Sequence, residues 1–385
     1  MILPNAKRNV LALGLVSFFN DIGSEMIFPL LPLFITITLG APVAVLGLIE
    51  GIAESAAALL KMGSGTLSDK VGKRKAIVVS GYSLSALAKP FFALATIWQH
   101  VLAVRFLDRV GKGVRDAPRD ALLAASAKDS RRGRSFGFVQ AMDRGGAIAG
   151  TLIATALLAM AFNYRQIFLL AFIPSLLAVV VAALFVKEIA HAPLKRLEWP
   201  WKNHFGAELK KFLLVAGLFN VANFSYAFYL LKAQQAGLAV VLIPMLYLTY
   251  TVCYALAAYP VGRLSDSIGR KKVIGIGYAL FALTAAGFAT LTGTAMLWPL
   301  FVLYGIQIAF TDSVSRAFVS DMVEDKRRGS ALGAYHMTVG LAVLPASVIA
   351  GFVWDAFGSA MTFSLAAVVA MMALLLLATV KGKVR

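Results

Sequence analysis

Charged side chains recur inside an otherwise apolar stretch of the chain at residues 99–127. They return every three or four positions, which puts them along one side of a helix: Arg105, Asp108, Arg109, Lys112, Arg115, Asp116, Arg119 and Asp120. An ionised group costs a few kcal/mol inside a bilayer, so this stripe is expected to face the interior of a helix bundle. Such residues can carry protons, hold a charged solute, or form a structural lattice of ion pairs.

Carboxylates on other apolar stretches could also carry protons. Glu50 and Glu54 are four residues apart and share a helix face, and two carboxylates so close in a low dielectric compete for ionisation, which suits a proton carrier. The candidates for proton or cation coupling are Asp21, Glu25, Glu50, Glu54, Asp108 and Asp116. Na⁺ coupling through the same acids and a purely structural lattice both stay open as alternatives.

A second group of residues could recognise a solute. On the charged stripe, Arg105 and Lys112 are expected to face a cavity, whereas Asp108 and Arg109 are expected to pair within the lattice. The second half of the chain has lost most carboxylates and offers neutral hydrogen-bonding and aromatic groups, suited to an organic solute: Asn220, Asn223, Tyr247, Tyr250, Gln307 and His336. These residues could equally be ordinary interhelical contacts.

Enzymatic signatures are absent from the sequence. It has no metal-ligand cluster, catalytic triad or phosphate-binding loop, and the single cysteine, Cys253, allows no disulfide within the chain. We therefore expect a protein that is not an enzyme and needs no cofactor beyond a coupling ion, H⁺.

The elements that must position these residues are membrane spans. Of the 385 residues, 59% are hydrophobic and 15% charged, which excludes an ordinary water-soluble globule. About twelve apolar stretches are long enough to cross a hydrocarbon core as helices. The predicted spans are 10–38, 43–63, 75–97, 99–127, 135–162, 166–187, 209–232, 238–261, 273–293, 295–322, 330–354 and 357–380.

The positions of the residues behind the formal charge of +18 indicate how the chain is oriented in the membrane. Most Lys and Arg residues outside the spans lie at the two ends of the chain and in alternate connections, whereas the other connections hold Arg165 and Lys232. This asymmetry places both termini in the cytoplasm. Since the basic residues form no single patch, a nucleic-acid partner is not expected.

The two halves of the chain repeat each other. Residues 65–74, Gly-Thr-Leu-Ser-Asp-Lys-Val-Gly-Lys-Arg, recur as Gly-Arg-Leu-Ser-Asp-Ser-Ile-Gly-Arg-Lys at 262–271, and Arg131-Arg132-Gly133 recurs as Arg327-Arg328-Gly329. Parallel repeats of this kind are a known transporter plan. The sequence predicts an N-terminal six-helix bundle at 1–187, a cytoplasmic linker at 188–208 and a C-terminal six-helix bundle at 209–385.

The repeated segment resembles the signature loop of the major facilitator superfamily, G-x-x-x-D-[RK]-x-G-[RK]-[RK]. Residues 105–113 are similar to a second family segment on span four, with Asp108 in place of Gln and Arg109 in place of the first Gly. The glycine run of span five, residues 145–150, lacks the Pro that drug antiporters of the superfamily carry there. The resemblance implies two pseudo-symmetric six-helix bundles around a central cavity, and secondary active transport by alternating access.

In the family the signature loop latches the cytoplasmic side, and the resemblance carries that role to Gly65, Asp69, Gly72 and Arg74, with Asp266 in the second copy. We expect Asp69 at the N-terminus of the third spanning helix, where a carboxylate meets the positive end of the helix dipole. The loop could instead be a topological anchor only.

The prediction is thus an all-α, multi-pass transporter of the cytoplasmic (inner) membrane, acting as a monomer in the lipid bilayer. It would move a small polar, zwitterionic or anionic organic solute with proton coupling. Alternatives are a drug or siderophore exporter driven by proton antiport, a Na⁺-coupled symporter and, in another class, a lipid-handling membrane protein.

Overall fold

A computed structural model describes residues 4–126, 132–189, 205–324 and 327–381. In this part of the chain all regular secondary structure is helical and there is no strand. The elements are α1 (Pro4–Glu25), α2 (Leu31–Leu33), η1 (Phe34–Thr38), α3 (Val43–Val71), α4 (Arg74–Leu94), α5 (Trp98–Ser126), α6 (Arg132–Ala159), α7 (Tyr164–Leu170), α8 (Phe172–Phe185), α9 (Ala207–Ala222), α10 (Ala227–Gln235), η4 (Val240–Leu242), α11 (Ile243–Ile268), α12 (Arg270–Ala289), α13 (Leu297–Asp321) and α14 (Arg328–Thr379).

The helices have the lengths that membrane spans require. Among the described residues, 8 helical segments are long and apolar enough to cross a bilayer. Three other long helices, α1, α5 and α6, carry more charged side chains, and α14 is divided by Gly358, whose φ of 84° is not helical. Together they make the twelve-helix, all-α membrane fold that the sequence predicts.

The chain divides into two compact units. Unit 1 comprises Met1–Ala41 and Ile52–Leu197, and unit 2 comprises Pro42–Gly51 and Glu198–Arg385. The first turns of α3 therefore group with unit 2, which the expected division between 1–187 and 209–385 does not anticipate. Most of the expected linker, residues 190–204, lies outside the described residues, so the exact boundaries stay a prediction.

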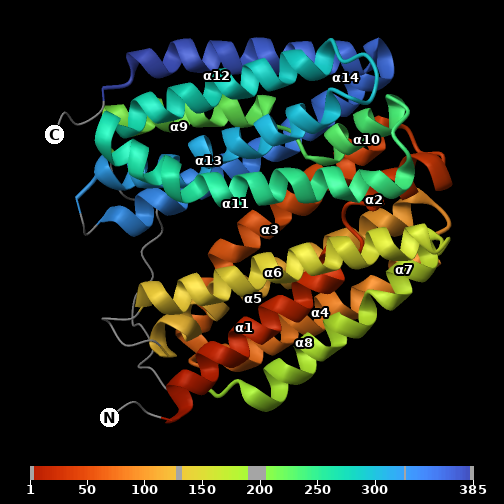
Figure 1. Ribbon diagram of the computed structural model, residues 1–385. Helices are drawn as coiled ribbons and strands as arrows, with labels where there is room; N and C mark the ends of the chain where they lie inside the picture. Colours follow the sequence, from red (N-terminus) through yellow and green to blue (C-terminus); the bar gives the residue numbers. More distant parts are fainter. Residues whose placement is uncertain (1–3, 127–131, 190–204, 325–326, 382–385) are drawn as a thin grey trace. The chain divides into compact units, whose positions relative to one another are not determined.

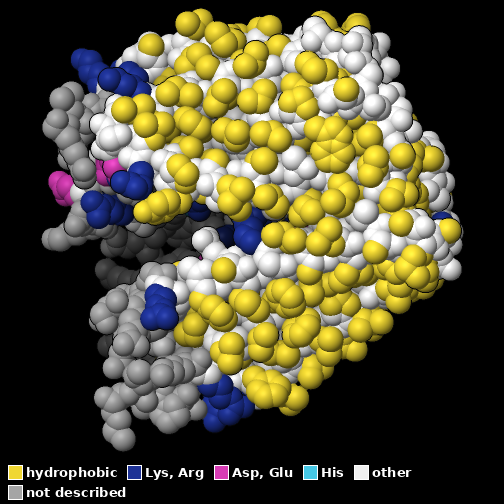
Figure 2. Space-filling model, viewed as in Figure 1, with side chains coloured by type: hydrophobic (Ala, Val, Ile, Leu, Met, Phe, Trp, Pro, Cys, Tyr) yellow, Lys and Arg dark blue, Asp and Glu magenta, His cyan; other side chains and the backbone are white. Residues whose placement is uncertain are grey.

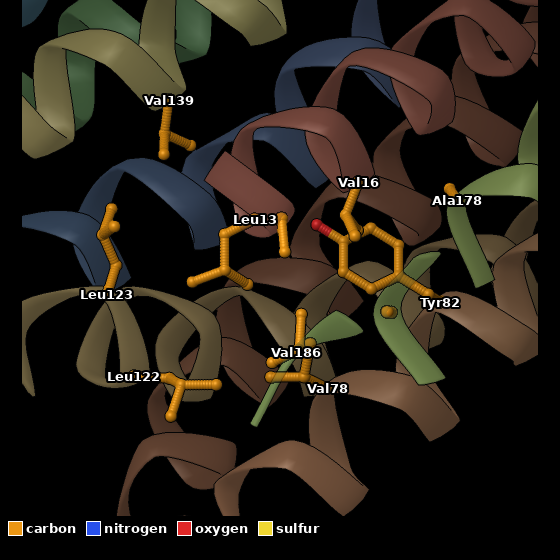
Figure 3. Close-up of a cluster of buried hydrophobic side chains, with 11 residues drawn as sticks. Leu13, Val16, Val78, Tyr82, Leu122, Leu123, Val139, Ala178 and Val186 are labelled. Atoms are coloured by element: carbon orange, nitrogen blue, oxygen red, sulfur yellow. The ribbon is translucent and has the colours of Figure 1, made fainter. Parts of the chain in front are cut away.

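In unit 1, α1 packs against α6 and α8, and α4 packs against α5 and α8 (Figure 1). Apolar side chains from these five helices form the core that Figure 3 shows: Leu13, Val16, Val78, Tyr82, Leu122, Leu123, Val139, Ala178 and Val186. Glycines let the helices approach closely. A Cβ on Gly111 of α5 would lie 2.6 Å from the carbonyl oxygen of Gly81 on α4.

In unit 2, α11 packs against α13, α12 packs against α13 and α14, and α9 packs against α14. Figure 2 shows hydrophobic side chains spread over the face of α11, with Lys and Arg gathered at one end of the unit. Leu256 and Tyr259 on α11 and Phe352 on α14 are among the most exposed of these apolar groups. Exposed apolar side chains of this size suit a helix surface in contact with lipid tails.

Both units interrupt their first long span. The sequence predicts continuous spans at 10–38 and 209–232, but α1 ends at Glu25 and α9 ends at Ala222. Pro29 and Pro32 follow the first interruption, and a Pro cannot donate the backbone hydrogen bond that a helix interior needs. At the second, Asn223 leaves the helical region with ψ of 69°. Backbone N–H groups at both interruptions stay hydrogen-bonded within the chain, for example Met26 N–H to the Ile22 carbonyl and Asn223 N–H to the Phe219 carbonyl, both at 3.1 Å.

Candidate functional site

The charged stripe of α5 faces the interior of unit 1. Arg105, Asp108, Arg109 and Arg115 are buried, whereas Phe106 and Leu107 on the other side of the same helix are exposed. This is the orientation that the three- and four-residue spacing predicts. Lys112, Asp116, Arg119 and Asp120 are half-buried.

Two arginines of the stripe share one carboxylate from α3. Arg109 Nε lies 3.1 Å from Glu54 Oε1, and Arg105 Nη2 lies 3.8 Å from the same oxygen. Asp108 Oδ2 lies 3.9 Å from Arg105 Nη1 and 4.0 Å from Arg109 Nε. We call these residues, Glu54, Arg105, Asp108 and Arg109, the arginine-pair cluster. It places Arg105 within the same set of ion pairs as Asp108 and Arg109, not apart from them.

Close helix packing brings the cluster together. A Cβ on Gly113 of α5 would lie 2.8 Å from the carbonyl oxygen of Ala57 on α3. Gly113 is one turn beyond Arg109, and Ala57 is one turn beyond Glu54, so the missing side chain lets the two helices meet at the depth of the cluster.

Phe28 also belongs to this site, although its place in the sequence does not indicate it. Its ring lies 4.0 Å from the guanidinium carbon of Arg105 and 4.7 Å from that of Arg109. Guanidinium groups stack favourably on aromatic faces. Phe28 lies in the interruption after α1, and one phenylalanine among 26 gives no sequence signal for this contact.

Further ion pairs line the rest of the stripe. Lys61 Nζ lies 3.8 Å from Asp116 Oδ2, and Arg119 bonds to Asp120 and lies 3.9 Å from Asp143. Arg115 donates to Ser85 Oγ at 2.6 Å and stacks 4.4 Å from the Tyr82 ring. In this part of unit 1, acidic and basic side chains lie next to one another as a network of ion pairs.

Lys89 and Asp21 are two further ionisable residues of unit 1, the first buried and the second half-buried. Lys89 is 0% exposed, and its ammonium group donates to Ser175 Oγ at 2.7 Å. Asp21 on α1 is half-buried and accepts from Asn20 Nδ2 at 3.0 Å. Glu25 is the last residue of α1, so it lies directly at the interruption of that span.

Glu50 and Glu54 have separate surroundings. Glu50 belongs to unit 2, is buried, and accepts from Ser225 Oγ at 3.3 Å, beside the interruption between α9 and α10. Glu54 belongs to unit 1 and interacts with the charges of Arg109, Lys112, Arg105 and Asp108. The pairing of the two carboxylates, which lie four residues apart on α3, stays a prediction.

Unit 2 gathers the aromatic residues that the sequence places in the solute wall. The Tyr247 ring lies 5.0 Å from that of Tyr250 and 5.2 Å from that of Tyr226, and Tyr250 lies 5.2 Å from Tyr304. Gln307 on α13 is 0% exposed, and neither its amide nitrogen nor its amide oxygen has a hydrogen-bond partner among the described residues.

The structure gives local contacts for the other expected solute residues. Asn220 donates to the Ala216 carbonyl at 2.8 Å, and Asn223 ends α9. His336 is exposed, with its ring 5.7 Å from that of Tyr335. Among the described residues, no group of three or more His, Cys, Asp or Glu side chains could hold a metal ion.

The signature loop differs from expectation at Asp69. This residue lies in the last turn of α3, not at the N-terminus of α4, which follows Lys73. The carboxylate that accepts from the first backbone N–H groups of α4 is Glu188, 3.2 Å from Arg74 N and 2.8 Å from Lys75 N. A residue so distant in sequence gives no local capping signal.

The structure also describes Gly65, Gly72 and Asp266, three other residues expected in the latch. Gly65 lies in α3, and Gly72 has φ of 69° between α3 and α4, a conformation that favours glycine. In unit 2, Asp266 lies 3.8 Å from Arg270 Nη2, and Arg270 Nε lies 2.7 Å from Asp321 Oδ2.

Comparison with known proteins decides the family. The model of the Major Facilitator Superfamily matches residues 13–248 and 212–384. An MFS-type transporter of Methanocaldococcus jannaschii is 39% identical over 379 residues, covering 96% of this chain and 94% of that protein. The chain belongs to the major facilitator superfamily. As a member of it, this is a multi-pass membrane transporter, which confirms the resemblance of the signature loop.

Solved structures confirm the fold of this superfamily member. The nucleoside transporter NupG matches with a TM-score of 0.81 at 16% identity, covering 96% of this chain and 98% of that one. A bacterial homolog of the human lysosomal transporter Spinster matches with a TM-score of 0.80 at 14% identity, over 97% and 96% of the two chains. A multidrug resistance protein MdtH of Photorhabdus laumondii is 31% identical over 143 residues, 37% of this chain and 35% of that protein.

Proposed function

We propose that this transporter moves a small polar, zwitterionic or anionic organic solute across the cytoplasmic membrane by alternating access, coupled to protons. It acts as a monomer in the inner membrane with both termini in the cytoplasm, an orientation supported by the positive residues at the ends of the chain and in alternate connections.

The observation that carries the coupling proposal is the exposure of Glu54. Its side chain is 36% exposed, whereas those of its partners Arg105 and Arg109 are 0% and 5% exposed. A carboxylate that reaches solvent while bound to buried cations can exchange a proton with water and change its pairing when it does so. Asp21, Glu25, Glu50, Asp108 and Asp116 are the further coupling candidates.

Solute recognition is assigned to two sets of side chains. Arg105 and Lys112 provide positive charge in unit 1. In unit 2, Tyr247 and Tyr250 provide aromatic surface. Gln307 provides a buried amide whose two polar atoms have no hydrogen-bond partner among the described residues, and apolar surface with a few polar groups is typical of organic ligand sites. Asn220, Asn223 and His336 complete the proposed set.

The test begins with a thermal-shift screen of the purified protein against metabolite, siderophore and drug panels at two pH values, because a ligand raises apparent stability. Uptake of the best ligand into proteoliposomes under an imposed pH gradient then measures coupling. We expect Asp21→Asn and Glu54→Gln to abolish pH-driven accumulation while exchange of solute across the membrane continues. Accumulation equal to that of the parent in both variants would contradict proton coupling through these residues.

A drug exporter working by proton antiport is the second candidate, favoured by the 143-residue match to the multidrug resistance protein MdtH. The two candidates differ in direction. Inverted vesicles energised with an internal acid pH should accumulate dye-like drugs if the chain is an exporter, and should not do so if it is an importer of metabolites.

A further inference from the structure

The charges of the four residues in the arginine-pair cluster balance, while Lys112 acts on Glu54, and Lys89 and Arg115 act on Asp108, from outside the cluster. Arg105 and Arg109 supply two positive charges, and Glu54 and Asp108 supply two negative ones, all within 4.0 Å of a partner. Losing the negative charge of either carboxylate would leave one buried positive charge uncompensated, which is costly unless another anion replaces it.

Asp108 and Glu54 differ in how easily each could leave its ion pairs with the two arginines. Asp108 lies on α5 with both arginines, and its side chain is 4% exposed. Glu54 comes from α3 and its side chain is 36% exposed. A change of pairing in this cluster therefore falls on Glu54, which is the more exposed of the two carboxylates and lies on a different helix from the arginines.

The arginines are held in place independently of Glu54. Both guanidinium groups lie against the ring of Phe28, at 4.0 and 4.7 Å, and both also lie near Asp108. Stacking of this kind fixes the plane of a guanidinium and so preserves its hydrogen-bonding fork when one anion is exchanged for another.

From these observations we infer that Glu54 occupies the place of an anionic group of the solute. When Glu54 takes up one proton from the aqueous solution and turns away, a carboxylate of the solute binds Arg109 and Arg105 in its place. No covalent bond of the solute changes: one proton is bound at the Glu54 carboxyl and one negative charge enters with the solute, so the charge of the cluster is conserved.

This inference rests on the proposed proton coupling and narrows it. It assigns the solute class as monocarboxylates, since one negative charge is displaced and a planar carboxylate matches the fork of an arginine. It also assigns an electroneutral ratio of one proton to one carboxylate. Neutral solutes of the same shape would leave the arginine pair uncompensated and should not bind.

Binding to the detergent-purified full chain tests the inference without transport. The probes are acetate, lactate and benzoate, with acetamide, lactamide and benzamide as neutral counterparts, each followed by thermal shift from about pH 6 to about pH 8. For the parent we expect one or more carboxylates to bind, the amides to fail, and affinity to weaken by up to about tenfold per pH unit, as linkage to one proton requires.

Two variants distinguish the role of Glu54 as the competing anion from that of Arg109 as the group that binds the solute. In Glu54→Gln the carboxylate should bind at least as tightly as in the parent and independently of pH, because the competing anion is gone. In Arg109→Gln, binding should be lost. Glu324→Gln, which removes an exposed carboxylate just after α13, is the matched control and should keep the parental affinity and pH slope.

An infrared difference spectrum covers the case in which Glu54→Gln does not fold. Adding the bound carboxylate to the parent should produce the C=O stretch of a newly protonated carboxyl group. Absence of that band, binding of amides as tight as of carboxylates, a flat pH profile in the parent, or no carboxylate binding at all would each overturn the inference. If the inference fails, proton-driven uptake of a neutral solute would still support the proposed function. Conversely, pH-linked binding of a carboxylate without proton-driven uptake would reject the proposed function and leave the inference standing.

Discussion

At the scale of single residues, the site depends on partners that compensate buried charge. Spacing alone predicted that the stripe of α5 faces inward, because helix geometry fixes which residues share a side. It could not predict that Arg105 and Arg109 converge on one oxygen of Glu54, since that depends on how α3 and α5 pack. Nor could it single out Phe28, whose contact with both arginines is invisible in the sequence.

Phe28→Leu is expected to weaken carboxylate binding by about tenfold while the pH dependence stays. Leucine keeps apolar volume but removes two guanidinium–ring contacts, each worth about 0.5–2 kcal/mol. The matched control is Phe92→Leu, since Phe92 is also buried but packs on the ring of Phe168. Equal losses of affinity in the two variants, measured by titration, would show that Phe28 only fills space.

Asp108→Asn should lower stability by about 3–5 kcal/mol, because it leaves two buried guanidinium groups sharing one carboxylate. Adding Arg109→Gln restores the charge balance, so the double variant should recover thermal stability but not carboxylate binding. Thermal unfolding in detergent measures the first effect, and ligand titration the second.

The pair Asp312 and Arg316 provides the comparison, with side chains 43% and 41% exposed and 2.8 Å apart. Asp312→Asn should cost less than about 1 kcal/mol, as exposed ion pairs do. A similar loss in Asp108→Asn would mean that burial of the arginine-pair cluster carries no penalty.

At the scale of elements, glycines set how closely the helices approach. Gly111 meets Gly81 between α4 and α5, and Gly113 meets Ala57 between α3 and α5. The glycine run on α6 acts similarly, because a Cβ on Gly146 or Gly150 would collide with backbone atoms of α1. Apolar length predicted where the helices occur, but the interruptions after Glu25 and Ala222 and the cap that Glu188 gives α4 depend on tertiary contacts.

Gly111→Ala should lower thermal stability by about 1–3 kcal/mol, since the added methyl group would press on the backbone of α4. Gly137→Ala is the control, because Gly137 lies in α6 with open space where a Cβ would sit. There the same change should be neutral or stabilising by up to about 1 kcal/mol, as alanine favours helix. Unfolding temperatures of both variants in one detergent decide the matter, and equal shifts would refute the packing role of Gly111.

At the scale of the whole molecule, transport requires a change of conformation that the signature loop is proposed to control. The repeat of residues 65–74 at 262–271 and the apolar spans predicted the superfamily from sequence. The assignment of Pro42–Gly51 to unit 2 could not be predicted, because nothing in the composition of α3 marks a change of neighbours after Gly51.

Asp69→Asn is expected to slow turnover strongly while ligand affinity changes only by the accompanying shift in conformational populations. Counterflow in proteoliposomes measures turnover, and titration in detergent measures affinity. Normal turnover with lost binding would assign Asp69 to the solute site instead of the latch.

Two lysines make the same kind of contact in the two halves of the chain. Lys75 donates to the Ala183 carbonyl at 2.8 Å at the end of α8, and Lys271 donates to the Ala378 carbonyl at 2.8 Å at the end of α14. Each lysine is the second residue of its helix, α4 or α12, and each ties the third span of its half to the last. Because the same clasp occurs in both halves, the simplest history is that an ancestral six-span protein already had it before its gene was duplicated and fused. The two halves share this contact but differ in charge, since the second half has Val221 and Thr251 where the first half has Asp21 and Glu54.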